Sequence, residues 1–232
     1  ILAAACCFLL PHCPPKGGPP KNALDVLGLR AFRLFKQRDT AVFFGTAFLF
    51  SIPLSAYFMH TPQQLRFLGC EQIAAVMTVG QLTEVVAMLL MGWLLRRWTI
   101  KSIFVLALGC GTLRYLLYAA GAADDSIASV LIGVALHGIC WTYFFEAGKV
   151  FLARRIELAI RTQSQALLAL LTSGIGGLAG TALVGWAHGY LVDETTGAGW
   201  NNYWWLLTAV CAFCVIGFMI GYRGNQAEQK NG

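Results

Sequence analysis

Polar side chains interrupt an apolar segment, residues 72–95, that is long enough to cross a lipid bilayer. At helical spacing Gln81 and Glu84 share one face of this segment with Met77 and Met88. A carboxylate near the centre of a membrane helix costs about 2.5–3.5 kcal/mol on insertion scales unless it faces protein or water. We therefore expect Glu84 to face a polar cavity, where it can contact a solute and exchange a proton. The structural alternative is a hydrogen bond that only holds two helices together.

A second group of candidate residues lies in the apolar segment 127–152. His137, Trp141 and Phe144 form one stripe at helical spacing, with the polar imidazole at one end. Such a surface can stack on a planar ring. The alternative is an aromatic stripe that only fills the core of the bundle.

Three further charges lie at membrane depth. Glu146 and Lys149 are three residues apart, and we interpret them as a pair whose charges neutralise one another. Arg114, in the segment 101–121, is expected either to extend its charge towards the membrane surface or to pair with an acid of a neighbouring segment. We assign a structural role to all three.

The first complete apolar segment, residues 40–60, also has a polar face. Ser51, Ser55 and Phe58 lie on one face of it, and Pro53 lies beside them. A proline at membrane depth frees a carbonyl group and permits a bend, which transporters use where helices line a cavity. Packing alone is the alternative explanation for Pro53.

The composition shows which elements must position these residues. The chain has 232 residues, of which 57% are hydrophobic and only 12% are charged, and its mean hydropathy is +0.63. Soluble domains carry about 25% charged residues, so this chain has too few polar residues to cover a surface in water. It contains six apolar segments, each near the roughly 20 residues that span a bilayer: 40–60, 72–95, 101–121, 127–152, 163–191 and 201–222. The sequence therefore predicts an all-α, multi-pass integral membrane protein in a lipid bilayer.

Basic residues gather in alternate connections between these segments. They precede residue 40 and follow the second, fourth and sixth segments, whereas the opposite connections hold Arg66 together with several acidic residues. The positive-inside rule places the basic connections and the C-terminus in the cytoplasm. The net charge of +6 reflects these clusters, and no single basic stripe indicates a nucleic-acid partner.

The same patterns predict the organisation of the chain. Residues 1–11 are interpreted as the end of a membrane helix whose beginning is missing. Residues 12–39 are predicted to form a cytoplasmic loop with a basic helix on the membrane surface, or with a soluble linker helix. Residues 40–222 form a six-helix unit and residues 223–232 a cytoplasmic tail. The sequence has no metal-ligand spacing, phosphate loop or nucleophile triad, so we expect neither enzymatic activity nor a cofactor or metal.

Several short motifs resemble the nucleoside:proton symporters of the major facilitator superfamily, and the resemblance covers nearly the whole chain. The motifs are Leu10-Pro-His12, residues 28–36, Gln81-Leu-Thr-Glu84, Leu113-Arg114-Tyr115 and Arg161-Thr-Gln-Ser-Gln165. The matching part of that family is the C-terminal half, from the end of the sixth helix through the twelfth. The resemblance implies a twelve-helix transporter of two six-helix halves, with substrate bound between them and alternating access. The N-terminal half would then be the missing partner of this chain.

The resemblance also implies a substrate site. In that family a Gln and a Glu of the eighth helix contact the nucleoside, and they correspond to Gln81 and Glu84. A Tyr, a Phe and an Asp of the tenth helix correspond to His137, Trp141 and Thr142.

Two further positions come from the seventh helix, where a Gln and an Asn correspond to Ser55 and Phe58. Only Gln81 and Glu84 keep the residues of the family. Loss of the carboxylate at Thr142 and of the two amides removes polar contacts to a sugar or base, so the solute is expected to differ from an ordinary nucleoside. Glu84 is the candidate for proton coupling.

The sequence therefore predicts proton-coupled secondary transport of a nucleoside or a similar small polar solute across the inner cell membrane. Two alternatives stay open. One is a receptor or scaffold that has the same fold without transport, and the other is a facilitator for another solute, such as a sugar or drug.

Overall fold

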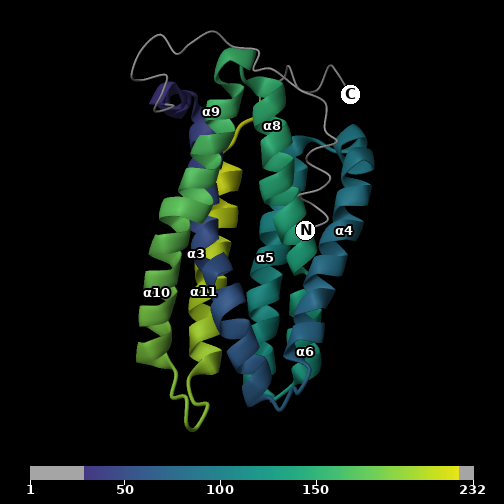
Figure 1. The fold of residues 1–232 in the computed structure, drawn as a ribbon, viewed down its shortest axis with the longest axis vertical. Coiled ribbons are helices and arrows are strands. Elements are labelled where there is room, and N and C mark those ends of the chain that lie inside the picture. Colours follow the sequence, from purple (N-terminus) through teal and green to yellow (C-terminus); the bar gives the residue numbers. More distant parts are fainter. Residues whose placement is uncertain (1–28, 225–232) are drawn as a thin grey trace, which may run out of the picture.

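The computed structural model describes residues 29–224, and all secondary structure in this range is helical. The long helices stand side by side, and their connections lie at the two ends of the bundle (Figure 1). The elements in chain order are η1 (Leu29–Lys36), α3 (Arg38–Phe67), α4 (Ile73–Arg97), α5 (Ile100–Ala123), α6 (Ile127–Ala135), α7 (His137–Trp141), η2 (Thr142–Glu146), α8 (Ala147–Arg155), α9 (Leu158–Ala169), η3 (Leu170–Gly174), α10 (Ile175–Leu191) and α11 (Trp200–Gly221).

Six helical stretches in the described range are long and apolar enough to cross a membrane, which confirms the six predicted segments. They are α3, α4, α5, the stretch from α6 to α8, the stretch from α9 to α10, and α11. Residues 1–11, most of the predicted loop 12–39 and most of the predicted tail 223–232 lie outside the described residues.

Two of these stretches contain a single turn of π-helix. η2 separates α7 from α8, and η3 separates α9 from α10. A π turn widens the helix locally and redirects the side chains that follow it, and such turns are frequent at functional sites. η2 begins at Thr142, directly after Trp141. The structure therefore places a local irregularity next to two of the predicted site residues.

Aromatic rings fill the core between α3, α5 and the stretch from η2 to α8. Phe43 and Phe104 are stacked with ring centroids 5.2 Å apart, and both contact Phe144 and Phe151 at 5.4–5.8 Å. Lipid tails are as apolar as these side chains, so close packing and favourable ring geometry stabilise the bundle more than burial from water does.

Glycines allow α10 to lie close against α3. A Cβ atom at Gly180 would lie 3.1 Å from the Cα atom of Ile52 and 3.2 Å from Cβ of Ser55, and a Cβ atom at Gly176 would overlap Ser51 Oγ. Small residues of segment 163–191 therefore permit close approach of the two helices at this interface.

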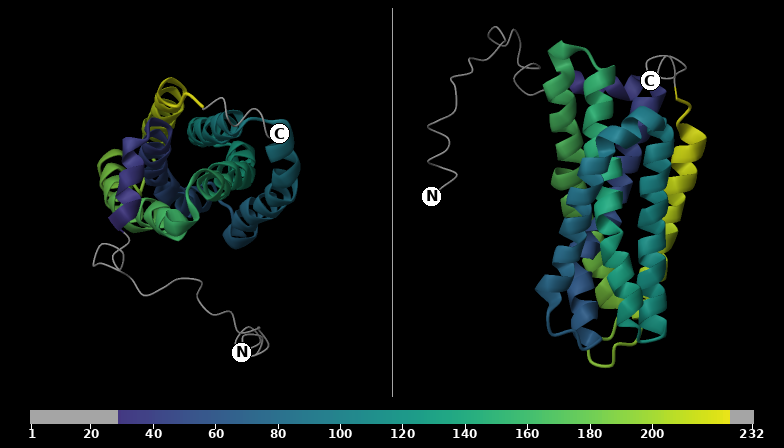
Figure 2. Two further views of the ribbon diagram at one scale, coloured as in Figure 1. Left: turned by 90° about the horizontal axis from the view of Figure 1, so that it is seen from above. Right: turned by 90° about the vertical axis from the view of Figure 1, so that its right-hand side faces the viewer.

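Helix α4 lies at the edge of the bundle, as the view along the helices shows (Figure 2). Only Gly80, Ala87 and Leu94 of this helix are buried, and they recur at intervals of seven residues. A Cβ atom at Gly80 would lie 2.6 Å from the hydroxyl oxygen of Tyr57. α4 therefore contacts the bundle through a narrow stripe, and most of its surface is exposed.

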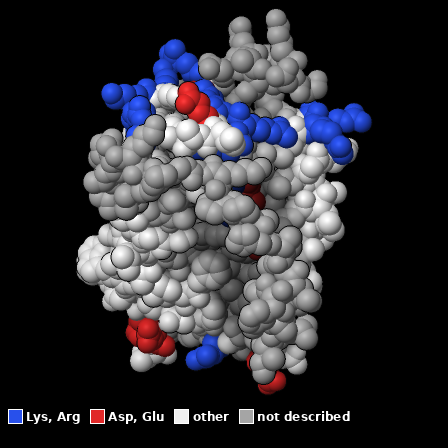
Figure 3. Space-filling model, turned by 45° about the horizontal axis from the view of Figure 1, so that its top comes forward, with Lys and Arg blue, Asp and Glu red and all other residues white. Residues whose placement is uncertain are grey.

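Charged residues gather at the two ends of the bundle. Figure 3 shows mainly Lys and Arg side chains around the end that carries the α8–α9 connection, and acidic side chains with a smaller basic patch at the opposite end. This separation follows the alternation of basic and acidic connections in the sequence.

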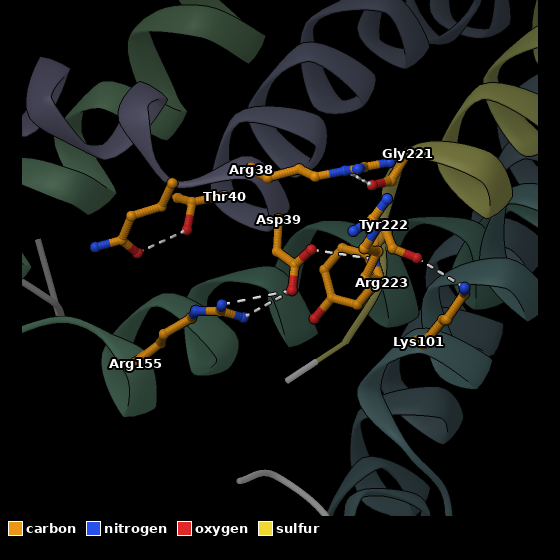
Figure 4. A network of polar contacts seen from close by, with 9 residues as sticks. Arg38, Asp39, Thr40, Lys101, Arg155, Gly221, Tyr222 and Arg223 are labelled. Atoms are coloured by element: carbon orange, nitrogen blue, oxygen red, sulfur yellow. Dashed lines mark hydrogen bonds and ion pairs between the residues drawn. The ribbon is translucent and has the colours of Figure 1, made fainter. Parts of the chain in front are cut away.

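The basic end is held together by Asp39, in the first turn of α3 (Figure 4). Both terminal nitrogens of Arg155 donate to its Oδ2 at 3.4 Å, and the backbone N–H of Arg223 donates to Oδ1 at 3.0 Å. One carboxylate thus joins the start of α3 to the ends of α8 and α11.

Two cations also contact the last carbonyl groups of α11 (Figure 4). Arg38 Nε donates to the carbonyl oxygen of Gly221 at 2.8 Å, and Lys101 Nζ donates to that of Tyr222 at 2.7 Å. The last carbonyls of a helix have no partner within it, and they carry its partial negative charge. Arg38 and Lys101 therefore cap α11 with residues from α3 and α5.

Candidate functional site

The polar face predicted for residues 72–95 lies on the exposed side of α4. Gln81 and Met88 are exposed, and Glu84 and Met77 are partly exposed. The carboxylate of Glu84 makes no hydrogen bond or ion pair with another residue in the described range. It is therefore available to a solute or to a further part of the protein.

The turn of α4 that carries Glu84 packs directly against α7. A Cβ atom at Gly138 would overlap the backbone nitrogen of Glu84 and lie 2.6 Å from its Cα atom. The hydroxyl group of Thr142 donates to the carbonyl oxygen of Glu84 at 3.5 Å. Of the predicted site residues, His137 directly precedes Gly138 in the sequence and Thr142 follows it by one helical turn. Both therefore lie close to the backbone of Glu84.

His137 is the centre of an aromatic cluster. It is buried, and its ring stacks on Tyr57 at a centroid distance of 4.1 Å with the two planes 5° apart. Phe58 meets the imidazole edge to face at 5.6 Å, and Trp141 lies 6.2 Å away with its plane tilted by 25°. The structure therefore brings His137, Trp141 and Phe58 together, from two spans that are separate in the sequence.

Arg114 is fully buried against this cluster. Its Nη1 lies 3.0 Å from Nδ1 of His137, and its Nη2 donates to the hydroxyl group of Tyr115 at 2.8 Å. The guanidinium lies over the rings of Tyr57 and Tyr115, with centroid distances of 5.0 and 4.5 Å. The hydroxyl group of Tyr115 in turn donates to the carbonyl oxygen of Pro53.

These contacts differ from both arrangements expected for Arg114. It does not extend to the membrane surface, and no carboxylate in residues 29–224 forms an ion pair with it. Instead the charge is stabilised by an imidazole nitrogen, a phenol oxygen and two aromatic faces.

Ser55 lies apart from this cluster. Its hydroxyl group donates to the carbonyl oxygen of Ser51 at 3.3 Å and lies against Gly180 of α10. Its neighbour Phe58, one turn later, contacts His137 instead. The face predicted for residues 40–60 is therefore divided between two different neighbours of α3.

Glu146 and Lys149 form the expected ion pair, with 2.6 Å between Lys149 Nζ and Glu146 Oε1. Glu146 is the last residue of the π turn and is partly exposed, and Lys149 is exposed. Its presence confirms that i, i+3 spacing brings these two charges together.

Sequence reasoning gave no site role to Tyr57, and it did not predict that Arg114 would contact His137. Tyr57 is adjacent to Phe58, so an aromatic pair at membrane depth was a signal for it. Arg114 lacked an opposing acid in the sequence pattern, and an unpaired cation next to an aromatic residue could have indicated a ring or imidazole partner.

Six helical stretches in the described range that are long and apolar enough to cross a membrane are the architecture of a multi-pass membrane protein. The chain belongs to the nucleoside H⁺ symporter family, which matches residues 1–227. The family match confirms the resemblance seen in the sequence motifs.

Three proteins of Escherichia coli strain K12 are similar to this chain. YegT is 29% identical over 95% of the chain, the xanthosine permease 26% over 99%, and the nucleoside permease NupG 24% over 96%. The matched regions make up 54%, 58% and 56% of these proteins, so the chain spans about half the length of its curated relatives.

Two crystal structures of the nucleoside transporter NupG share this fold. The structure of a mutant has a TM-score of 0.77 at 23% identity, and a second structure has 0.75 at 22%. The matches cover 93% and 94% of this chain and 56% of each NupG chain. The similarity confirms the predicted all-helical fold, and the described helices correspond to about half of each NupG chain.

Proposed function

We propose that this chain is part of a longer transporter that moves a nucleoside-like solute together with a proton across the inner membrane. The observation that supports this most is the contact of α7 and η2 with the turn of α4 that carries Glu84. In this contact Gly138 and Thr142 lie against the backbone of Glu84, midway along their helices. Membership of the nucleoside H⁺ symporter family supports the same assignment.

In this proposal the solute lies on the exposed side of α4, between the described bundle and the rest of the longer protein. Gln81 and Glu84 orient the solute by hydrogen bonds, Trp141 stacks on its ring, and His137 and Phe58 shape the pocket. Thr142 is a weaker candidate for direct contact, because its hydroxyl group already donates to the carbonyl oxygen of Glu84. Ser55 supports the pocket through α10.

Glu84 is also the proposed proton-coupling residue, because its carboxylate has no hydrogen-bond or ion-pair partner in the described range and is partly exposed. The basic end of the bundle, with the end of α11, is proposed to face the cytoplasm.

The test is uptake of a radiolabelled nucleoside into proteoliposomes that contain the full-length protein, with an imposed proton gradient. The wild type is expected to accumulate the nucleoside against its gradient. Glu84→Gln is expected to stop accumulation, whereas the matched control Glu194→Gln, in the acidic connection between α10 and α11, is expected to transport normally. Accumulation by Glu84→Gln with an unchanged response to the proton gradient would exclude Glu84 as the coupling site.

Two other outcomes would favour the alternative functions. Saturable nucleoside binding without uptake would indicate a receptor or scaffold. Uptake of a sugar or drug without any competition from nucleosides would indicate a facilitator for another solute.

A further inference from the structure

The contact between Arg114 and His137 determines where the imidazole carries its proton. A guanidinium has five N–H donors and no acceptor, and it stays protonated in proteins. The 3.0 Å contact between Arg114 Nη1 and His137 Nδ1 is therefore a hydrogen bond that the imidazole accepts. An N–H group at Nδ1 would oppose the donor of Arg114. His137 is consequently neutral and carries its proton on Nε2.

The Arg114 side chain is itself held in place by its other contacts, so the fold fixes the donor that His137 Nδ1 faces. It is fully buried, its second terminal nitrogen donates to Tyr115, and its guanidinium lies over two tyrosine rings. Tyr115 is anchored to the carbonyl oxygen of Pro53 in α3. Arg114 has little freedom to turn away from His137.

The Nε2–H group of His137 has no hydrogen-bond partner within residues 29–224. His137 is only 1% exposed, and buried N–H groups in proteins are normally hydrogen-bonded. The hydroxyl group of Tyr57, whose ring stacks on the imidazole, is also buried without a partner. Both residues lie against Gly80, one turn before Glu84: a Cβ atom there would be 2.6 Å from Tyr57 Oη and 3.4 Å from His137 Cβ.

We infer that Arg114 is a positioning residue that holds His137 as the neutral Nε2–H tautomer, and that this N–H group selects solutes with a hydrogen-bond acceptor. A carbonyl oxygen or an unprotonated ring nitrogen of a nucleobase has the required chemistry. The selection of solute rests on the proposed transport function, whereas the tautomer does not. Arg114 acts only through His137 and does not touch the solute.

The tautomer is tested by ¹⁵N NMR of the full-length protein, labelled at histidine and reconstituted in bilayers at neutral pH. The signal of His137 is identified by difference from His137→Gln. We expect an unprotonated Nδ1 and a protonated Nε2 in the wild type. A protonated Nδ1, or protons on both nitrogens, would overturn the inference without any variant of Arg114.

The role of Arg114 is tested by Arg114→Met, which removes the donors and keeps a side chain of similar length. We expect the preference for the Nε2–H tautomer to be lost. The control Tyr115→Phe removes the other partner of the guanidinium and is expected to keep the wild-type tautomer. An unchanged His137 signal in Arg114→Met would show that Arg114 does not position the imidazole. If Arg114→Met does not fold, Arg114→Lys is measured instead: it keeps a donor towards Nδ1, so the Nε2–H tautomer is expected to persist, and a protonated Nδ1 in this variant would overturn the inference.

The selection of solute is tested by competition against uptake with matched analogues of one nucleoside, in each of which a single ring nitrogen is replaced by C–H. At least one analogue is expected to compete about tenfold less well than its parent in the wild type, because a buried donor would be left unpaired. His137→Phe is expected to remove this discrimination. Equal discrimination in the wild type and in His137→Phe would refute selection by His137. If no nucleoside competes at all, the proposed function and this selection both fail, while the NMR result still decides the tautomer.

Discussion

Asp39 and Arg155 form an ion pair between the first turn of α3 and the last turn of α8, with 3.4 Å between Asp39 Oδ2 and Arg155 Nη2. Both side chains are largely buried, and the other oxygen of Asp39 accepts from the backbone of Arg223. Three spans that are distant in the sequence therefore meet at one carboxylate.

This arrangement predicts that Asp39→Asn destabilises the basic end of the bundle. The neutral amide loses the charge that Arg155 faces, and we expect the free energy of unfolding to fall by about 1–3 kcal/mol. The measurement is thermal unfolding of the purified full-length protein in detergent. Asp124→Asn, at an exposed position at the opposite end of the bundle, is the matched control and should change stability by less than about 0.5 kcal/mol. Equal melting temperatures for Asp39→Asn and the wild type would show that the contact is not stabilising.

The close approach of α7 to α4 predicts a strong effect of Gly138→Ala. The added methyl group would overlap the backbone of Glu84, so the two helices must separate at the proposed solute site. Overpacking of this kind costs about 1–3 kcal/mol, and nucleoside binding should weaken together with stability. Gly109→Ala, in α5, is the control, because no atom lies within 4 Å of its added Cβ. Isothermal titration and thermal unfolding measure the two effects. Nucleoside affinity that is equal in Gly138→Ala and the wild type would place the solute elsewhere.

The six spans and the Glu146–Lys149 pair could be predicted because they depend on local properties of the chain. Hydropathy over about 20 residues determines whether a segment can cross a bilayer, and i, i+3 spacing brings two charges together on any helix. Neither prediction required knowledge of how the helices pack.

The contacts of Arg114 and Ser55 could not be predicted, because they depend on which helices become neighbours. A helix in the middle of a bundle has neighbours on several sides, so Ser55 and Phe58 share a face and still contact different helices. Arg114 was expected to extend to the membrane surface or to pair with an acid, yet α5 places it beside His137 of α7 and Tyr57 of α3. Spacing along one helix does not contain this information.

A hydrogen bond between α3 and α11 predicts that Tyr203→Phe destabilises the acidic end of the bundle. The hydroxyl group of Tyr203 lies 2.5 Å from Nδ1 of buried His60, whose ring also stacks on His188 at 4.3 Å. Removal of this hydroxyl group leaves a buried ring nitrogen without a partner, and we expect the free energy of unfolding to fall by about 1–3 kcal/mol. Tyr190→Phe, on the exposed side of α10, removes a hydroxyl group without this contact and should leave the melting temperature unchanged. The same melting temperature for both variants would contradict the prediction.

The connection between α10 and α11 predicts an acid-sensitive turn. Hydrogen bonds lower the pKa of Asp193 to about 2: first from the Thr195 hydroxyl group, then from the Thr195 backbone N–H, and then from the Thr196 hydroxyl group. The two hydroxyl contacts measure 2.6 and 2.9 Å. Because the folded pKa lies below the ordinary value near 3.9, the ionised carboxylate stabilises the turn above about pH 4. This contribution is lost as the pH falls through about 2.

Thr195→Val should raise the pKa of Asp193 towards its ordinary value, as measured by ¹³C NMR titration of the carboxyl group. Thr78→Val, in α4, removes a hydroxyl group far along the chain from Asp193 and should leave that pKa unchanged. A pKa near 3.9 for Asp193 in the wild type would show that the hydrogen bonds from Thr195 and Thr196 do not stabilise its ionised carboxylate.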